Sequence, residues 1–267
     1  MMDILGYEFM QNALAAGILA SVICGVIGSL VVVNRIVFIS GGIAHASYGG
    51  VGLAFLLGLP VLPVTTVFTV CAALVMAMVT LRDRERVDTV IGAIWAAGMA
   101  LGIILLDLTP GYNVDLMSYL FGSILAVTRS DLWLMAGLAV LVFGLVLVFF
   151  RGFLAMSFDE EFARARGVPV SFLHCLLIVL VGLCVVMIIR VVGLILVIAL
   201  LTIPPFIAER RTNSLKFMMI LSTALSVLFT VAGLWLSYSL DITSGAAIIA
   251  VATLSFFASM VLPGKKA

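Results

Sequence analysis

The sequence predicts an all-α integral membrane protein with eight or nine transmembrane helices, and three observations support this fold class. Hydrophobic residues make up 64% of the 267 residues and charged residues only 10%, whereas a water-soluble domain carries about a quarter charged residues. Apolar stretches close to the roughly 20 residues that cross a bilayer recur along the whole chain. No loop between them is long enough for a soluble domain, so residues 1–267 are expected to form one transmembrane domain.

The apolar stretches divide the chain into nine candidate spans. Two of them are atypical: the second is short, and the seventh follows its predecessor with almost no loop, which leaves the count at eight or nine. The spans lie near residues 10–33, 42–58, 62–81, 89–106, 131–150, 171–189, 191–208, 215–236 and 245–262.

The positions of the Lys and Arg residues predict the orientation of these spans. Cytoplasmic loops carry an excess of both residue types. Nine crossings with the N-terminus outside and the C-terminus in the cytoplasm leave only Arg129 and Arg190, of the 14 Lys and Arg residues, on the outer side. The net charge is +1 and no basic run with interleaved aromatic residues occurs, so the composition gives no indication of nucleic-acid binding.

Residues 35–58 contain the most distinctive pattern in the chain. Gly41, His45 and Gly49 are spaced by four and therefore share one helix face, which is expected to leave space above and below the imidazole. A second row of small residues on the neighbouring face predicts close approach of another helix backbone. This row consists of Gly42, Ala46, Gly50, Ala54 and Gly58.

An ionisable side chain at membrane depth indicates a functional site. We therefore expect His45 to lie on a substrate pathway, with Ser40, Gly41, Ser47 and Gly49 around it. The alternative interpretation is a buried histidine that bonds to a backbone carbonyl. No second histidine is nearby in sequence, and the four cysteines lack metal-type spacing, so His45 is the one candidate metal ligand.

Two further segments carry local signals. On the outer side, residues 115–127 predict a helix too short to span the membrane. On the cytoplasmic side, residues 157–167 predict a short surface helix with a capping box of Ser157 and Glu160 at its start and a stop at Gly167.

The helix over 157–167 has two interpretations. It is either an inert surface helix or a docking helix that fits a groove of a soluble partner. Its acidic first turn and basic last turn match the helix dipole in both cases. The docking residues would be Phe158, Asp159, Glu160, Glu161, Phe162, Ala163, Arg164, Arg166 and Gly167.

A double proline, Pro204 and Pro205, lies inside the seventh span. Proline removes a backbone donor and interrupts the hydrogen-bond ladder of a helix. The carbonyl groups that lose their partners must be covered by protein or face water at membrane depth. The pattern predicts a kinked helix, which either moves beside a pathway or is a tolerated packing kink.

The sequence lacks the motifs of an enzyme. It contains no phosphate-binding Gly-x-x-x-x-Gly-Lys-[Ser/Thr] loop, no His-Glu-x-x-His and no Gly-x-Ser-x-Gly. Ser40, Ser47 and Tyr48 are near His45 in sequence, but no acid is placed to orient a catalytic base. We expect a protein that is not an enzyme, so any directed work takes its energy from a partner or an ion gradient.

Taken together, several segments resemble the permease subunits of manganese, zinc and iron ABC importers. The resemblance covers nearly the whole chain, and each segment by itself would be a weak signal. The segments are residues 35–58 with Ala-His-Ala and glycines, 118–127 with Leu-Phe-Gly-Ser-Ile, 159–168, 192–208, and 240–247 with Asp-x-x-Ser-Gly-Ala.

The resemblance implies a type II ABC importer permease fold and a homodimer in a bacterial or archaeal cytoplasmic membrane. It implies two cytoplasmic ATPase subunits, which hydrolyse ATP and contact residues 159–168, and an extracytoplasmic binding protein that delivers a divalent metal ion. No structurally bound cofactor is expected. Metal-chelate permeases, which are longer by a span, and a gradient-driven carrier remain the alternatives.

The chain departs from the family pattern at one position of the expected metal path. The family has an Asp four residues before the histidine, and this chain has Gly41 there. An Asp and a His at that spacing share one cation, so only His45 carries over. A single imidazole suits a conduit that the ion must leave again. The sequence does not show whether another residue replaces the carboxylate.

Overall fold

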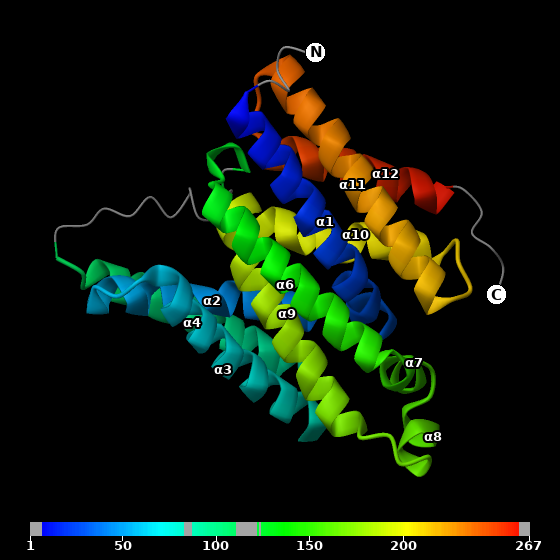
Figure 1. The fold of residues 1–267 in the computed structure, drawn as a ribbon. Helices are drawn as coiled ribbons and strands as arrows, with labels where there is room; N and C mark the ends of the chain where they lie inside the picture. The colour runs from blue at the N-terminus through cyan, green and yellow to red at the C-terminus, as the bar shows by residue number, and fades with distance from the viewer. Residues whose placement is uncertain (1–6, 83–86, 111–121, 123, 262–267) are drawn as a thin grey trace. The chain divides into compact units, whose positions relative to one another are not determined.

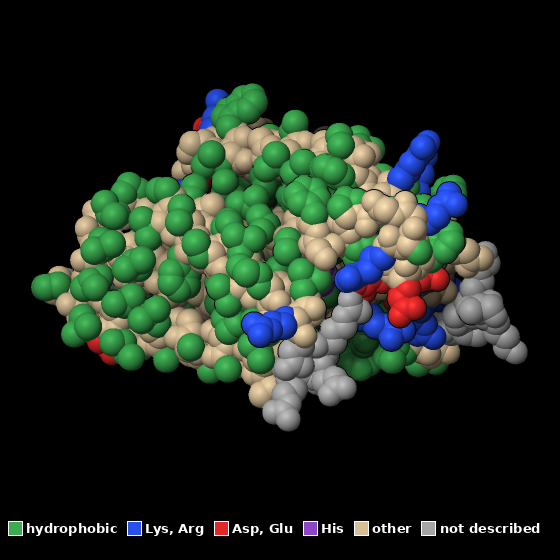
Figure 2. Space-filling view, turned by 90° about the horizontal axis from the view of Figure 1, so that it is seen from below, with side chains coloured by type: hydrophobic (Ala, Val, Ile, Leu, Met, Phe, Trp, Pro, Cys, Tyr) green, Lys and Arg blue, Asp and Glu red, His purple; other side chains and the backbone are tan. Residues whose placement is uncertain are grey.

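The computed structural model describes residues 7–82, 87–110, 122 and 124–261. All regular secondary structure in this part of the chain is helical (Figure 1), which confirms the predicted fold class. Hydrophobic side chains cover most of the surface in view in Figure 2, and charged ones are few there. The chain divides into two compact units, which are described separately: residues 1–34, 117–145 and 188–267, and residues 35–116 and 146–187.

The first unit is built around a central helix, α1, that packs against α10 and α11, while α12 packs against both of those helices. The short 3-10 helix η2 also lies against α1, and most of α6 belongs to this unit. The bounds are α1 Glu8–Val33, η2 Ile124–Ala126, α6 Arg129–Val148, α10 Leu194–Glu209, α11 Leu215–Leu240 and α12 Ser244–Val261.

The second unit is built around α2, which packs against both α3 and α4. A pair of short helices, α7 and α8, connects α6 to α9, and most of α9 belongs to this unit. The bounds are α2 Val37–Leu57, α3 Val61–Arg82, α4 Val87–Asp107, α7 Phe150–Phe158, α8 Glu160–Ala165 and α9 Val170–Val192.

The helices match the predicted spans in order and position. By length and composition, α1, α3, α4, α6, α9, α11 and α12 are each able to cross a membrane. Of the nine predicted spans, α2 and α10 are not in this set, and they are the two that the sequence marks as atypical. Helix α10 has 16 residues, whereas α2 has 21 and is longer than expected. Most of the expected outer helix over 115–127 lies outside the described residues. The 3-10 helix η2 lies at the C-terminal end of that segment.

The junction between α9 and α10 is a single residue, as the sequence predicts. Gly193 has a φ of +85°, which side chains other than glycine rarely adopt. Its amide still donates to the Ile189 carbonyl at 2.8 Å, so α9 remains hydrogen-bonded to its end. Gly122 packs directly against the Gly193 amide.

Helix α10 continues through Pro204 and Pro205 and ends at Glu209, so the double proline does not end the helix. Because Pro205 has no N–H, the Leu201 carbonyl loses its helical partner. This carbonyl lies against Gly28 of α1, where an added Cβ would be 2.6 Å from the oxygen. Close packing on a glycine therefore covers the freed carbonyl.

Candidate functional site

Helices α2 and α4 approach each other closely over two turns. A Cβ added to Gly98 would lie 2.6 Å from Ala46 Cα, and one added to Gly102 would lie 2.7 Å from the Tyr48 carbonyl carbon. We call these four residues the α2–α4 seam. Ala46 belongs to the predicted row of small residues, so the expected close approach of another helix backbone is confirmed.

The seam brings an aromatic ring of α4 onto His45. The His45 and Trp95 rings stack with their centroids 4.1 Å apart and their planes 13° from parallel. Trp95 is held in turn, because its Nε1–H donates to Met99 Sδ at 3.2 Å. One face of the imidazole is therefore covered by an indole that has its own partner one turn further along α4.

The two ring nitrogens of His45 differ in their surroundings. Nδ1 is buried and has no hydrogen-bond partner among the described residues, although the residue as a whole is only half-buried. The structure therefore does not support a buried histidine that bonds to a backbone carbonyl through Nδ1. Nε2 is not among the buried unpartnered atoms, so it is the nitrogen with access to its surroundings.

The two glycines on the His45 face have different surroundings. No atom lies within 4 Å of the Cβ position of Gly41, so the space there is open as predicted. At Gly49 the expectation of open space is wrong, because an added Cβ would lie 2.6 Å from Phe68 Cζ of α3. The imidazole therefore has free space on the Gly41 side, where the family pattern places a carboxylate.

The two serines near His45 in sequence are bound to their own helix. The Ser40 hydroxyl donates to the Val37 carbonyl at 2.7 Å, and the Ser47 hydroxyl donates to the Ala44 carbonyl at 2.6 Å. Both residues are almost fully buried. The structure brings neither hydroxyl into a hydrogen bond with His45.

This arrangement suits transient contact with a cation better than tight binding. The described residues contain no group of three or more His, Cys, Asp or Glu side chains that could hold a metal ion. One neutral imidazole with one open side offers a single ligand, and a conduit requires that the ion leaves again.

The predicted surface helix is shorter than expected and begins elsewhere. Asp159 is the N-cap of α8, and its Oδ1 accepts from the Phe162 amide at 2.8 Å. The expected capping box of Ser157 and Glu160 is wrong, because Ser157 lies in the last turn of α7 and the chain becomes extended only at Asp159. Gly167, with a φ of +78°, follows the helix as the predicted stop.

The end of α7, helix α8 and its C-cap present aromatic and charged side chains together. Phe158 and Phe162 are 70% and 59% exposed, which is unusual for large apolar side chains outside a lipid-facing span. The Arg166 guanidinium lies 5.7 Å from the centre of the Phe162 ring, and Arg164 pairs with Glu160 at 2.7 Å. The ion pair and the cap order the helix, while the two rings remain available.

A family model described as the ABC 3 transport family matches residues 6–263. The chain belongs to the ABC 3 transport family. The family resemblance inferred from the sequence is therefore confirmed, and its predicted membrane-embedded permease architecture agrees with the helices described above.

Several relatives and a solved structure match almost the whole chain. An uncharacterized membrane protein of Synechocystis is 48% identical over 260 residues, covering 97% of this chain and 92% of the relative. The manganese transport system membrane protein MntC of Halalkalibacterium halodurans is 36% identical over 254 residues, covering 95% and 87%. The solved structure of PsaBC from Streptococcus pneumoniae in complex with Fab matches with a TM-score of 0.87 at 35% identity, covering 98% and 95%.

Trp95 belongs to this site, because it stacks on His45, and the sequence analysis did not identify it. Trp95 is the only aromatic residue of α4, and it precedes Gly98 of the seam by one turn. The spacing of Trp95 and Gly98 could have predicted a contact with the partner helix, because residues one turn apart lie on the same helix face. The partner of Trp95 depends on tertiary packing and is not visible in the α4 sequence.

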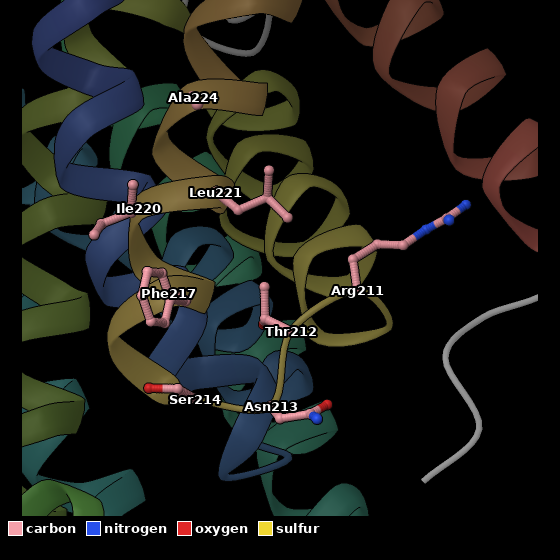
Figure 3. A pocket seen from close by; sticks show the side chains of 8 residues that line it. All are labelled: Arg211, Thr212, Asn213, Ser214, Phe217, Ile220, Leu221 and Ala224. Atoms are coloured by element: carbon pink, nitrogen blue, oxygen red, sulfur yellow. The ribbon is translucent and has the colours of Figure 1, made fainter.

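A separate open groove of about 630 Å³ lies at the turn between α10 and α11 (Figure 3). Its lining contains no carboxylate and no histidine, and it shares no residue with the site predicted from the sequence. The groove therefore offers no carboxylate, imidazole or thiolate ligand to a divalent transition metal. It is lined by Arg211, Thr212, Asn213, Ser214, Phe217, Ile220, Leu221 and Ala224.

Proposed function

We propose that this chain is the transmembrane subunit of an ATP-driven importer of a divalent transition-metal ion. The family comprises ABC transport permeases, and the observation that carries the metal is the match over 95% of the chain to a manganese transport system membrane protein. Manganese is therefore the first candidate, with zinc and iron after it. The half-buried imidazole beside open space supports the same function, because imidazole is a common ligand of such metals.

The importer would contain two copies of this chain, two cytoplasmic ATPase subunits and an extracytoplasmic binding protein that delivers the ion. The assembly would reside in the bacterial or archaeal cytoplasmic membrane, with the N-terminus outside. Arg129 pairs with Glu8 at 2.9 Å and Arg190 with Asp131 at 3.3 Å, so the two cations left on the outer side both have acidic partners.

The passing ion would contact His45 through Nε2. Gly41 contributes open space. Ser40, Ser47 and Gly49 form the packed surroundings on α2, and the two serine hydroxyls donate their hydrogens to carbonyls of the same helix. A single ligand binds weakly enough to release the ion on the cytoplasmic side. Further ligands would come from water or from the second copy of the chain.

Transport is coupled to ATP hydrolysis through α8 in this proposal. The exposed rings of Phe158 and Phe162 would enter a groove of the ATPase, and the charged residues around them would fix the register. Pro204 and Pro205 would lower the resistance of α10 to bending, because two helical hydrogen bonds are absent there.

Uptake by the reconstituted complex tests this function. Proteoliposomes with the permease, its ATPase and its binding protein should take up radioactive Mn²⁺ in an ATP-dependent manner. His45→Ala should lower uptake at least ~10-fold at normal expression, because a ligand of the path is lost. The matched control is His174→Ala, which removes the other histidine and its bond to Thr80 at 2.8 Å.

Three results would contradict the proposal in different ways. Unchanged uptake in His45→Ala would make His45 a structural residue. Uptake of a metal chelate in place of the free ion would favour a metal-chelate permease. Mn²⁺ uptake without any ATPase would favour a gradient-driven carrier.

A charge reversal tests the coupling through α8. Glu160→Lys should uncouple uptake from ATP hydrolysis while membrane insertion stays normal. Arg164→Ala breaks the same ion pair without reversing a charge, so a defect in Glu160→Lys alone would be due to the reversed charge, and a defect in both variants to loss of the pair or of Arg164 itself. Equal uptake and ATPase activity in Glu160→Lys and the wild type would exclude docking through this helix.

A further inference from the structure

A metal-binding histidine needs a fixed ring orientation. The usual device is a hydrogen bond from the second ring nitrogen to a carboxylate, a backbone carbonyl or a water molecule, which sets the tautomer and the ring plane. His45 lacks this device among the described residues, because its buried Nδ1 has no partner. A buried polar atom without a partner costs about 1–3 kcal/mol, so this arrangement calls for an explanation.

Trp95 supplies the missing restraint. The two rings are nearly parallel at 4.1 Å, so the imidazole cannot rotate out of its plane without colliding with the indole. One contact holds the Trp95 side chain and another holds its helix. Its Nε1–H donates to Met99 Sδ, and the close contact of Gly98 with Ala46 sets the distance between the two helices.

We propose that Trp95 is a positioning residue for metal transport. This inference rests on the proposed function, since it assigns His45 to the path of the ion. The stack holds the imidazole plane so that Nε2, the nitrogen with access to its surroundings, faces the passing cation. Trp95 acts through His45 and is not itself a ligand, because an indole offers a donor N–H and no lone pair for a metal.

Substitutions at Trp95 separate this role from simple packing. Trp95→Leu keeps an apolar side chain but removes the stack, and we expect the KM for Mn²⁺ uptake to rise ~10-fold with little change in kcat. Trp95→Phe retains an aromatic face and should restore most of the affinity. A packing role alone would lower the amount of folded protein and leave the KM of the remaining protein unchanged.

Tryptophan fluorescence gives a readout that does not depend on transport. The chain has three tryptophans, and Trp133 and Trp235 are 77% and 55% exposed. The double variant Trp133→Phe/Trp235→Phe leaves Trp95 as the single emitter in the full-length chain in lipid nanodiscs. Paramagnetic Mn²⁺ held by His45 would lie next to the indole and should quench its emission in a saturable manner.

The outcomes distinguish this inference from the proposed function. Saturable quenching by Mn²⁺ that His45→Ala abolishes, together with a raised KM in Trp95→Leu, supports it. A His45→Ala loss of uptake with an unchanged KM in Trp95→Leu would overturn the positioning role and leave the proposed function intact. Unchanged uptake in His45→Ala would instead overturn the function assigned to His45. If Trp95→Leu does not fold, the decision falls to the quenching titration, whose persistence in His45→Ala would overturn the inference.

Discussion

Each unit of the molecule contains a seam where glycines let two helices approach closely. In the second unit it is the α2–α4 seam described above. In the first unit α1 packs on α11, where a Cβ added to Gly17 would lie 2.6 Å from Thr230 Cγ2 and one added to Gly25 would lie 2.6 Å from Thr223 Cα. We call these residues, with Ser21, the α1–α11 seam. The two seams use the same packing device, which is common between membrane helices.

The seams differ in whether an ionisable group lies beside them. In the α1–α11 seam, Ser21 and Thr230 bond to each other at 3.0 Å across the two helices. Beside the α2–α4 seam, the Nδ1 atom of His45 is enclosed without a partner. A glycine seam is therefore not a functional signal by itself. The signal is an ionisable group that the seam encloses but does not satisfy.

The largest expected effect comes from closing the α2–α4 seam. In Gly98→Val the new Cβ would lie 2.6 Å from Ala46 Cα, so helices α2 and α4 must separate. We expect a loss of about 3 kcal/mol in the free energy of unfolding, measured by SDS titration. Gly92→Ala on the same helix is the control, because no atom lies within 4 Å of its Cβ position. Equal stability of the two variants would refute the tight seam.

The matching change in the other seam should cost about as much and leave the metal site unaffected. Gly25→Val meets the Thr223 backbone, and we expect a loss of about 3 kcal/mol in the same titration. The KM for Mn²⁺ of the protein that remains folded should equal that of the wild type. A raised KM would show that the two seams do not differ in function.

A carboxylate at the open position beside His45 should strengthen metal binding. Gly41→Asp meets no atom within 4 Å of its Cβ and adds an oxygen ligand one turn from the imidazole. We expect the KM for Mn²⁺ to fall ~10-fold, equivalent to about 1.4 kcal/mol. Gly41→Asn has the same size without the charge and serves as the control. A lower KM in both variants would argue against metal coordination by the carboxylate.

The smallest effect is expected at the satisfied hydroxyl pair. Ser21→Ala removes the bond to Thr230, and hydrogen bonds between membrane helices contribute about 0.6 kcal/mol on average. Uptake kinetics should be unchanged. A large change in KM would place this hydroxyl on the path of the ion and remove the contrast between the seams.

The features that depend on local sequence were predictable. Hydropathy located the helices because burial in lipid requires long apolar segments, and Gly167 marked the stop after α8 because its backbone conformation suits glycine. The choice between Ser157 and Asp159 as the cap was not predictable from residue type, since both side chains are good caps and α7 continues past Ser157.

The features that depend on other helices were not predictable. The space beside Gly49 is filled by Phe68 from α3, and the His45 ring is covered by Trp95 from α4. The α2 sequence predicts only that the backbone of another helix approaches closely. Which side chain arrives there depends on how the helices pack, and no local pattern encodes it.

The short helix α10 has a consequence for the biogenesis of the protein. Its 16 residues extend about 24 Å, less than the roughly 30 Å of the hydrocarbon core. Most of its side chains are buried against protein, and a single glycine joins it to α9. Lipid therefore cannot define its position during insertion into the membrane. We expect α10 to reach its place only after α11 and α12, which follow it in the chain and pack against it, have formed, so that late folding, rather than the insertion machinery, completes this part of the chain.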